Sequence, residues 1–197
     1  MTSPTADAPD TGPLRAADLQ LRGAAGAIRS RVYWPRAIVP AAALVPPGLL
    51  VWFPDPGTDA PASGRDAFVR ALCSPAGMVV VVVGPGPRPD QAAGDAVEAT
   101  AWIADHAREL GADAHRLAVG GEGAGVVLAT LVARRAAEEG WPPIGHRLLV
   151  RPGDSPAAAA AVLRAALAGR VGRAAPGGPA GAGGAAGAGG SLGEVAP

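Results

Sequence analysis

The sequence predicts an α/β fold: a three-layer α/β/α sandwich with a mostly parallel sheet of about six strands and an antiparallel hairpin at its N-terminal end. Apolar runs of strand length alternate with helical patterns along the chain, an order typical of parallel strands joined by crossover helices. Residues 79–83 are five consecutive valines. A strand that is apolar on both faces indicates a parallel sheet covered by helices on both sides.

The expected elements follow in chain order. Residues 19–35 carry two short alternating stretches around a glycine-containing turn, which predicts the hairpin. Apolar runs predict strands at 48–53, 77–83, 116–120 and 146–150. Helical spacing and end signals predict helices at 64–73, 90–110, 124–140 and 155–169. In the last of these, Ser155 is the expected N-cap, with Pro156 at the first helical position.

Composition divides the chain of 197 residues into three parts. Residues 1–18 are polar and interrupted by prolines, and predict a flexible N-terminal arm. Residues 173–197 are rich in glycine, alanine and proline, and predict a disordered tail. The folded domain is therefore expected at 19–172.

Charge and hydropathy exclude several classes of partner. The 17 Lys+Arg and 17 Asp+Glu residues balance, with no basic stripe, so no nucleic-acid partner is expected. The longest apolar run, residues 37–53, contains three prolines and is a poor membrane span. The N-terminus lacks the pattern of a signal peptide, which favours a cytoplasmic protein. Heavy use of alanine, glycine, arginine and proline suits a GC-rich bacterial genome.

Missing residue types narrow the chemistry further. Every basic residue is arginine, which excludes the lysine of a Walker-A loop, Schiff-base chemistry and S-x-x-K hydrolases. The three histidines are widely spaced and form no H-x-x-x-H, and the single cysteine, Cys73, forms no C-x-x-C. No metal and no cofactor are expected, and Cys73 is interpreted as a buried apolar residue.

A glycine-rich turn lies between the strand expected at 116–120 and the helix that follows it. In α/β-hydrolases such a turn presents the nucleophile in the pattern G-x-S-x-G. Here the five residues are Gly121, Glu122, Gly123, Ala124 and Gly125. The glycines are in place and the central serine is absent.

The segments "RVYWP", "LLVWF", "VVVVVGPGPRP", "WIADHARELGADAHRLAVGGEGAG" and "HRLLVRP" resemble, in this order, those of the hormone-sensitive-lipase-like esterases. This is the α/β-hydrolase fold-3 group, and the resemblance runs from about residue 21 to 152. It implies a hydrolase fold and an ancestry among carboxylesterases. Since the family's sheet has two further strands, which deliver the triad acid and histidine, it also implies a C-terminally truncated member.

The departures from the family pattern fall on the catalytic machinery. The family's H-G-G-G is replaced by Pro54, Asp55, Pro56 and Gly57, and its serine by Gly123. Ala124 could still offer one oxyanion N–H, but Pro56 has none, and Asp55 would bring negative charge near the oxyanion. The resemblance therefore implies a degenerate nucleophile elbow and a degenerate oxyanion loop, with no catalytic residue assigned.

Other residues offer poor substitutes. Ser155 stands at the start of a helix like an elbow serine, but Pro156 behind it cannot donate an N–H. His106, His115 and His146 fall where the family has no base, and surface or packing roles are favoured for them. Glu122 is interpreted as a charge at a helix start, and anion binding by this turn is disfavoured because Glu122 would oppose it.

The sequence thus favours a non-catalytic α/β-hydrolase homologue, a pseudoenzyme of the esterase/lipase group. Two alternatives stay open: an active carboxylic-ester hydrolase with an unrecognised nucleophile, and a fragment that does not fold alone. The last expected strand leaves a sheet edge that could support self-association, although Pro142, Pro143 and Arg147 protect it in part.

Overall fold

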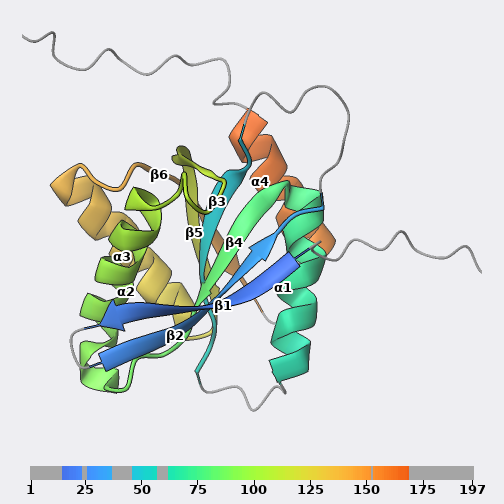
Figure 1. The fold of residues 1–197 in the computed structure, drawn as a ribbon. Helices are drawn as coiled ribbons and strands as arrows, with labels where there is room; N and C mark the ends of the chain where they lie inside the picture. The colour runs from blue at the N-terminus through green and yellow to red at the C-terminus, as the bar shows by residue number, and fades with distance from the viewer. Residues whose placement is uncertain (1–14, 24–25, 37–45, 57–61, 152, 169–197) are drawn as a thin grey trace, which may run out of the picture.

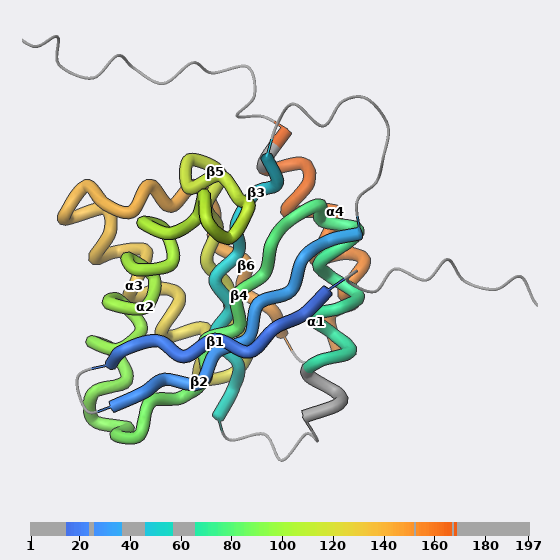
Figure 2. Tube along the Cα trace, viewed as in Figure 1, coloured from blue at the N-terminus to red at the C-terminus, as the bar shows by residue number. Residues whose placement is uncertain are grey.

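Six strands form one sheet in the computed structural model, which describes residues 15–23, 26–36, 46–56, 62–151 and 153–168 (Figures 1 and 2). The strands are β1 (Arg15–Gly23), β2 (Gly26–Trp34), β3 (Gly48–Phe53), β4 (Met78–Val83), β5 (Asp113–Glu122) and β6 (Ile144–Val150). Their order across the sheet is β1-β2-β4-β3-β5-β6. β1 and β2 form an antiparallel hairpin that joins β4 antiparallel, whereas β4, β3, β5 and β6 are mutually parallel.

Helices cover both faces of this sheet. Helices α1 (Ala62–Ala76) and α4 (Pro156–Ala168) lie on one face, and α2 (Ala92–Asp105) and α3 (Gly125–Glu139) on the other (Figure 1). A short 3₁₀ turn, Pro89–Gln91, leads into α2. The three layers and the mostly parallel sheet confirm the fold class that the sequence predicts.

The core consists of two apolar layers separated by the sheet. One layer packs residues of α2 and α3, such as Ile103 and Val132, against Val79 and Val81 of the valine run. The other packs α1 and α4, including Leu72 and Leu163, against Val80. Consecutive valines thus contribute to opposite layers, which is why every residue of the run from 79 to 81 is fully buried.

The boundaries of most elements differ from the sequence-based expectation by three residues or fewer, and those of β1 and α2 differ by more. β1 begins at Arg15, inside the expected arm, because all nine of its residues pair with β2, from Arg15 opposite Trp34 onward. The Arg15 guanidinium also lies 3.9 Å from the centre of the Trp34 ring. Helix α2 ends at Asp105, before the expected residue 110. The residues after it form turns, and these end at Gly111, which has a φ of +74°.

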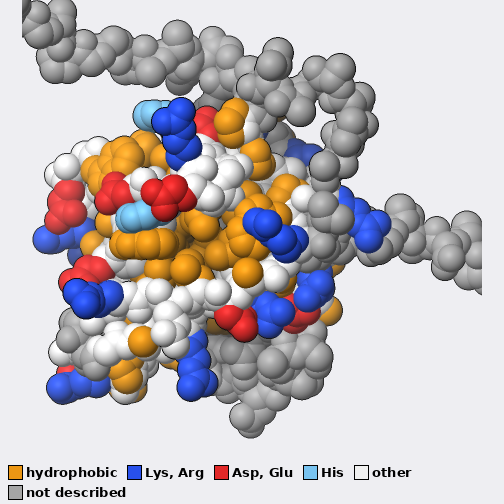
Figure 3. Space-filling view, viewed as in Figure 1, with side chains coloured by type: hydrophobic (Ala, Val, Ile, Leu, Met, Phe, Trp, Pro, Cys, Tyr) orange, Lys and Arg blue, Asp and Glu red, His pale blue; other side chains and the backbone are white. Residues whose placement is uncertain are grey.

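Residues 1–14 of the expected arm and the whole expected tail, 173–197, lie outside the described residues. None of the described helices is both long and apolar enough to cross a membrane. On the face seen in Figure 3, acidic and basic side chains are interspersed around an apolar centre, with no stripe of one charge. This distribution agrees with the formal net charge of zero.

Candidate functional site

Gly123 forms the turn between β5 and α3. Its φ of +54° lies in the left-handed region that favours glycine. The Val126 N–H donates to the Gly123 carbonyl at 3.2 Å and the Val127 N–H to the Ala124 carbonyl at 3.1 Å, so the helix begins directly after the turn. Strand, turn and helix follow one another as in a nucleophile elbow, but the residue at the centre has no side chain.

The two outer glycines of the turn allow the end of β3 to lie directly against it. Phe53 is the partner of Gly121 in the parallel ladder between β3 and β5. A Cβ atom at Gly121 would lie 2.8 Å from the Phe53 carbonyl oxygen, and a Cβ atom at Gly125 would collide with that same oxygen. Glycine is therefore required at both positions by close backbone approach, whatever the chemistry of the site.

Asp55, two residues beyond the end of β3, lies across from Gly123. A Cβ atom built on Gly123 would lie 2.8 Å from the Asp55 Cβ and would collide with the Asp55 carboxylate. The half-buried Asp55 side chain thus occupies the space that a side chain at residue 123 would need. The sequence offers these two positions as separate departures, and the structure brings them into contact.

Three of the four expected oxyanion-loop positions are described. Pro54 is buried, and Pro56 is exposed. Neither proline has a backbone N–H to offer to an oxyanion. Gly57 lies outside the described residues.

The two remaining residues of the elbow are Glu122 and Ala124. Ala124 is the N-cap of α3 and is exposed. Glu122 is the last residue of β5 and pairs with Val150, and no acidic residue stands in the first turn of α3. Glu122 therefore lies at the end of the strand, two residues before the N-cap of α3.

The histidines lie away from the elbow and are engaged elsewhere. His106 stacks on Trp102 with ring centres 3.9 Å apart, and its Nδ1 lies 2.8 Å from the Trp102 carbonyl oxygen. The Nε2 of His146 lies 3.0 Å from the Ala166 carbonyl oxygen of α4. His115 is exposed near the start of β5, at the opposite end of that strand from Gly123. No histidine is therefore placed to act as a base for this turn.

Ser155, the serine at a second strand-to-helix connection, caps α4. Its Oγ accepts the N–H of Ala157 at 3.2 Å and of Ala158 at 3.4 Å. This confirms the N-cap interpretation, since these bonds satisfy N–H groups at the helix start that have no partner within the helix.

Cys73 is a buried residue of α1. Its Sγ donates to the Met78 carbonyl oxygen at 3.1 Å and lies 3.6 Å from that of Tyr33. Burial raises the pKa of the Cys73 thiol to about 12. Since the thiolate is the reactive form, this cysteine is inert near neutral pH. Its burial confirms the interpretation of Cys73 as a buried residue.

A polar cluster that the sequence analysis missed links β2 to α1. The Tyr33 hydroxyl donates to Asp66 at 2.6 Å, and Asp66 also accepts from Arg70. Burial, together with the hydrogen bond to Asp66, raises the pKa of Tyr33. Burial opposes ionisation of Asp66, but the hydrogen bonds from Arg70 and Tyr33 outweigh it and lower the pKa of that carboxyl. The sequence holds one signal for this cluster: Asp66 and Arg70 are four residues apart in a predicted helix, a spacing that favours an ion pair.

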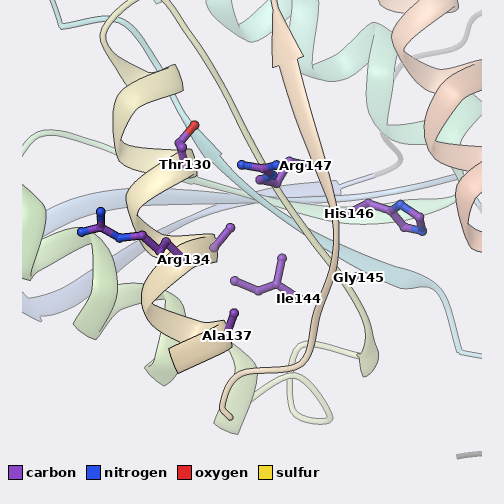
Figure 4. Close-up of a pocket in the computed structure, with 8 residues that line it drawn as sticks. Thr130, Arg134, Ala137, Ile144, Gly145, His146 and Arg147 are labelled. Atoms are coloured by element: carbon purple, nitrogen blue, oxygen red, sulfur yellow. The ribbon is translucent and has the colours of Figure 1, made fainter. Parts of the chain in front are cut away.

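No group of three or more His, Cys, Asp or Glu side chains suited to a metal ion occurs within the part of the chain that the structure describes. An open groove of about 460 Å³ lies between α3 and β6. Figure 4 shows Thr130, Arg134 and Ala137 on its helical side and residues 144–147 on its strand side, with the His146 ring turned away from α3. The residues of the glycine turn do not line this groove.

Comparison with known proteins agrees with the fold described above. A family model described as "alpha/beta hydrolase fold" matches residues 58–170. Esterase LipI of Mycobacterium tuberculosis is 37% identical over 144 residues, which cover 71% of this chain and 44% of that protein. Ethyl acetate hydrolase of Pseudomonas putida is 38% identical over 79 residues, 38% of this chain and 25% of that protein.

A solved esterase of Pyrobaculum calidifontis aligns over 70% of this chain and 45% of its own, with a TM-score of 0.59 and 29% identity. The chain thus spans less than half the length of each of these proteins.

Proposed function

The chain belongs to the alpha/beta hydrolase fold family, among the hormone-sensitive-lipase-like esterases, and on that premise we propose that it is a non-catalytic member. The observation that carries the proposal is Gly123 at the centre of the turn between β5 and α3. Ester hydrolysis by this fold forms a covalent acyl-enzyme on a side chain at this position. Glycine offers no atom that could attack.

The surroundings of the turn support the same proposal. An esterase needs N–H donors aimed at the developing oxyanion from two sides. Ala124 retains an N–H on the side of α3, whereas Pro56 has none on the side of β3. The Asp55 carboxylate also stands near the place where the oxyanion would form, and its charge opposes that of the transition state.

Residues that could substitute for the missing groups are engaged in other roles. Ser155 caps α4, Cys73 is buried as a thiol, and His146 contacts α4. The names of the relatives, an esterase and an ethyl acetate hydrolase, describe those proteins. We propose that this chain keeps their scaffold without their chemistry, and that it acts through binding or is no longer under selection for catalysis.

Turnover of a p-nitrophenyl acyl ester and labelling by a fluorophosphonate probe test this proposal on the full chain. We expect neither above the level of buffer, with an active esterase of the family as positive control. Sustained turnover that survives repurification would establish the alternative, an active carboxylic-ester hydrolase. In that case Ser155→Ala tests the exposed helix-cap serine as the hidden nucleophile, and Ser74→Ala, at a buried serine, serves as its control.

A bacterial source and a cytoplasmic location are also proposals. The alanine-, glycine- and arginine-rich composition supports the first, as do the two bacterial relatives. Cell fractionation of the native host, with an antibody against the chain, tests the second.

A further inference from the structure

We propose that Asp55 and Gly123 form a coupled pair, in which the Asp55 side chain fills the place of the nucleophile and the elbow is closed by the chain itself. The inference deepens the proposed non-catalytic function and rests on it. It explains why two departures that are 68 positions apart in the sequence occur together.

Asp55 makes the closest contacts with a side chain at residue 123. The three atoms nearest to a Cβ on Gly123 are the Oδ2, the Cγ and the Cβ of Asp55. The Cβ–Cβ distance would be 2.8 Å, which is closer than real Cβ atoms come. Rotation of the Asp55 carboxylate could relieve only the first two contacts, because the position of its Cβ is set by the backbone.

That backbone is held in place. Asp55 stands between Pro54 and Pro56, whose rings fix their own φ angles, and a residue before proline is confined to extended conformations. Two residues before Asp55, the Phe53 carbonyl oxygen lies against Gly121 and Gly125. The Asp55 side chain is therefore presented to the turn from a rigid segment, and any side chain at residue 123 would have to displace that segment.

In the family pattern that this sequence resembles, the glycine and the residue with a side chain are exchanged between these two positions. The esterase motifs carry glycine where this chain has Asp55, and serine where it has Gly123. In either pattern only one of the two positions carries a side chain, and the position that carries it differs. The structure assigns the reason: the space between the two segments holds one side chain and not two.

The occupied elbow has a consequence for ligands. For a side chain at residue 123 to attack an acyl group, that group would have to lie against the turn. The Asp55 carboxylate occupies this place. An ester is excluded there by volume, and an anionic analogue also by charge.

A double-mutant cycle measured by thermal melting of the full chain tests the pair. The variants are Gly123→Ala, Asp55→Gly and the two combined. Gly111→Ala is the matched control, since Gly111 is also exposed, has a φ of +74° and has open space around its Cβ position. We expect Gly111→Ala to lower Tm by about 2–8 °C, from the cost of a left-handed alanine alone.

Gly123→Ala should lower Tm at least twice as much as Gly111→Ala, or prevent folding. In the Asp55→Gly background the same substitution should cost no more than Gly111→Ala does, because the colliding side chain is gone. Asp55→Asn keeps the volume and removes the charge, so it should give no such rescue. Gly123→Ser combined with Asp55→Gly, the arrangement of the esterase motifs, should melt above Gly123→Ser alone.

Additive effects of the two substitutions would overturn the coupling, as would equal losses for Gly123→Ala and Gly111→Ala. A double variant that still fails to fold would do the same. These outcomes are independent of the activity assays. Ester turnover by the parent chain would contradict the proposed function. Additive changes in Tm in a chain without ester turnover would contradict only the coupling of Asp55 and Gly123.

Discussion

Gly123 illustrates at the scale of one residue how the residue type at the centre of the turn affects local stability. In an active α/β-hydrolase the nucleophile sits on a sharp, strained turn, and holding a side chain in the left-handed region costs about 1–2 kcal/mol. Gly123, with a φ of +54°, does not have this cost. Glycine at this position therefore relaxes the turn.

A serine placed at residue 123 should strain the turn without conferring ester turnover. We expect Gly123→Ser to lower Tm, because the new side chain is strained by φ and collides with Asp55. We expect no turnover of p-nitrophenyl esters, because Pro56 has no N–H and no histidine of the described chain lies at the turn. Tm and turnover can be measured on one purified variant. An unchanged Tm would contradict the strain, and turnover would reveal an unseen acid–base pair.

Ionisation of Cys73 should make stability depend on alkaline pH. Its thiol has a pKa of about 12 when folded, against about 8.5 in an unfolded chain. Its contribution to the free energy of unfolding is complete below about pH 8.5 and is lost as pH rises towards 12, because only the unfolded chain then releases the proton. The raised pKa of Tyr33 also makes the free energy of unfolding fall at higher pH. The pH dependence of the parent chain must therefore be compared with that of Cys73→Ala.

We expect the urea midpoint of the parent chain to fall more between about pH 8 and pH 10 than that of Cys73→Ala, which keeps the Tyr33 contribution. Parallel pH dependences would show that the thiol ionises equally in both states. Labelling by iodoacetamide at neutral pH provides a second readout, and the folded chain should react only after urea is added.

Helices α2 and α3 each contain a glycine in the first turn, and the two differ in what surrounds them. A Cβ at Gly94 of α2 would meet nothing within 4 Å, whereas a Cβ at Gly125 of α3 would collide with the Phe53 carbonyl oxygen. Gly94 thus lowers helix stability with no packing reason. Gly125 is what allows α3 to start against the end of β3.

The same substitution should therefore have opposite effects in the two helices. Gly94→Ala should stabilise the protein by about 0.5–1 kcal/mol, because alanine restricts the unfolded chain and suits a helix. Gly125→Ala should destabilise it by several times that amount, since the backbone of β3 cannot move freely. Urea denaturation of the two variants measures both. A tolerated Gly125→Ala would mean that α3 and β3 are not rigidly packed at this point.

For the whole molecule, the edge strand β6 is the feature that bears on assembly. β6 is the last strand in the order, and Arg147 on it is exposed. Two copies that paired antiparallel through the centre of β6 would bring their Arg147 side chains close together, and facing like charges destabilise a strand pair. The arginine therefore opposes edge-to-edge association.

We expect Arg147→Thr to raise the weight-average mass in sedimentation equilibrium at tens of micromolar, relative to the parent chain. Arg135→Thr, on the exposed side of α3, removes one arginine elsewhere and is the control for net charge. Equal masses for all three proteins would show that the charge on β6 does not govern association.

The expected tail gives a second prediction at this scale. Residues 173–197 contain almost no large apolar side chain, so their removal should take little buried area from the folded state. A chain that ends at Gly172 should melt within about 2 °C of the parent, which corresponds to less than about 1 kcal/mol. A larger fall in Tm would mean that the tail docks on the domain.

The sequence by itself determined the alternation of strands and helices, the three layers and the position of the glycine turn. It could do so because burial on both faces, helical spacing and turn glycines are local signals, readable within a short window. The absence of a side chain at Gly123 is also a property of the sequence alone. So is the absence of an N–H at Pro56.

Only the tertiary structure decided which of these positions act together. Phe53 pairs with Gly121, and the register of that one ladder places Asp55 against Gly123. The start of β1 at Arg15 likewise depends on its pairing with Trp34. Contacts between residues far apart in the chain follow from strand register and close packing, which no local pattern encodes. The two changed motifs therefore become one contact only in the folded protein.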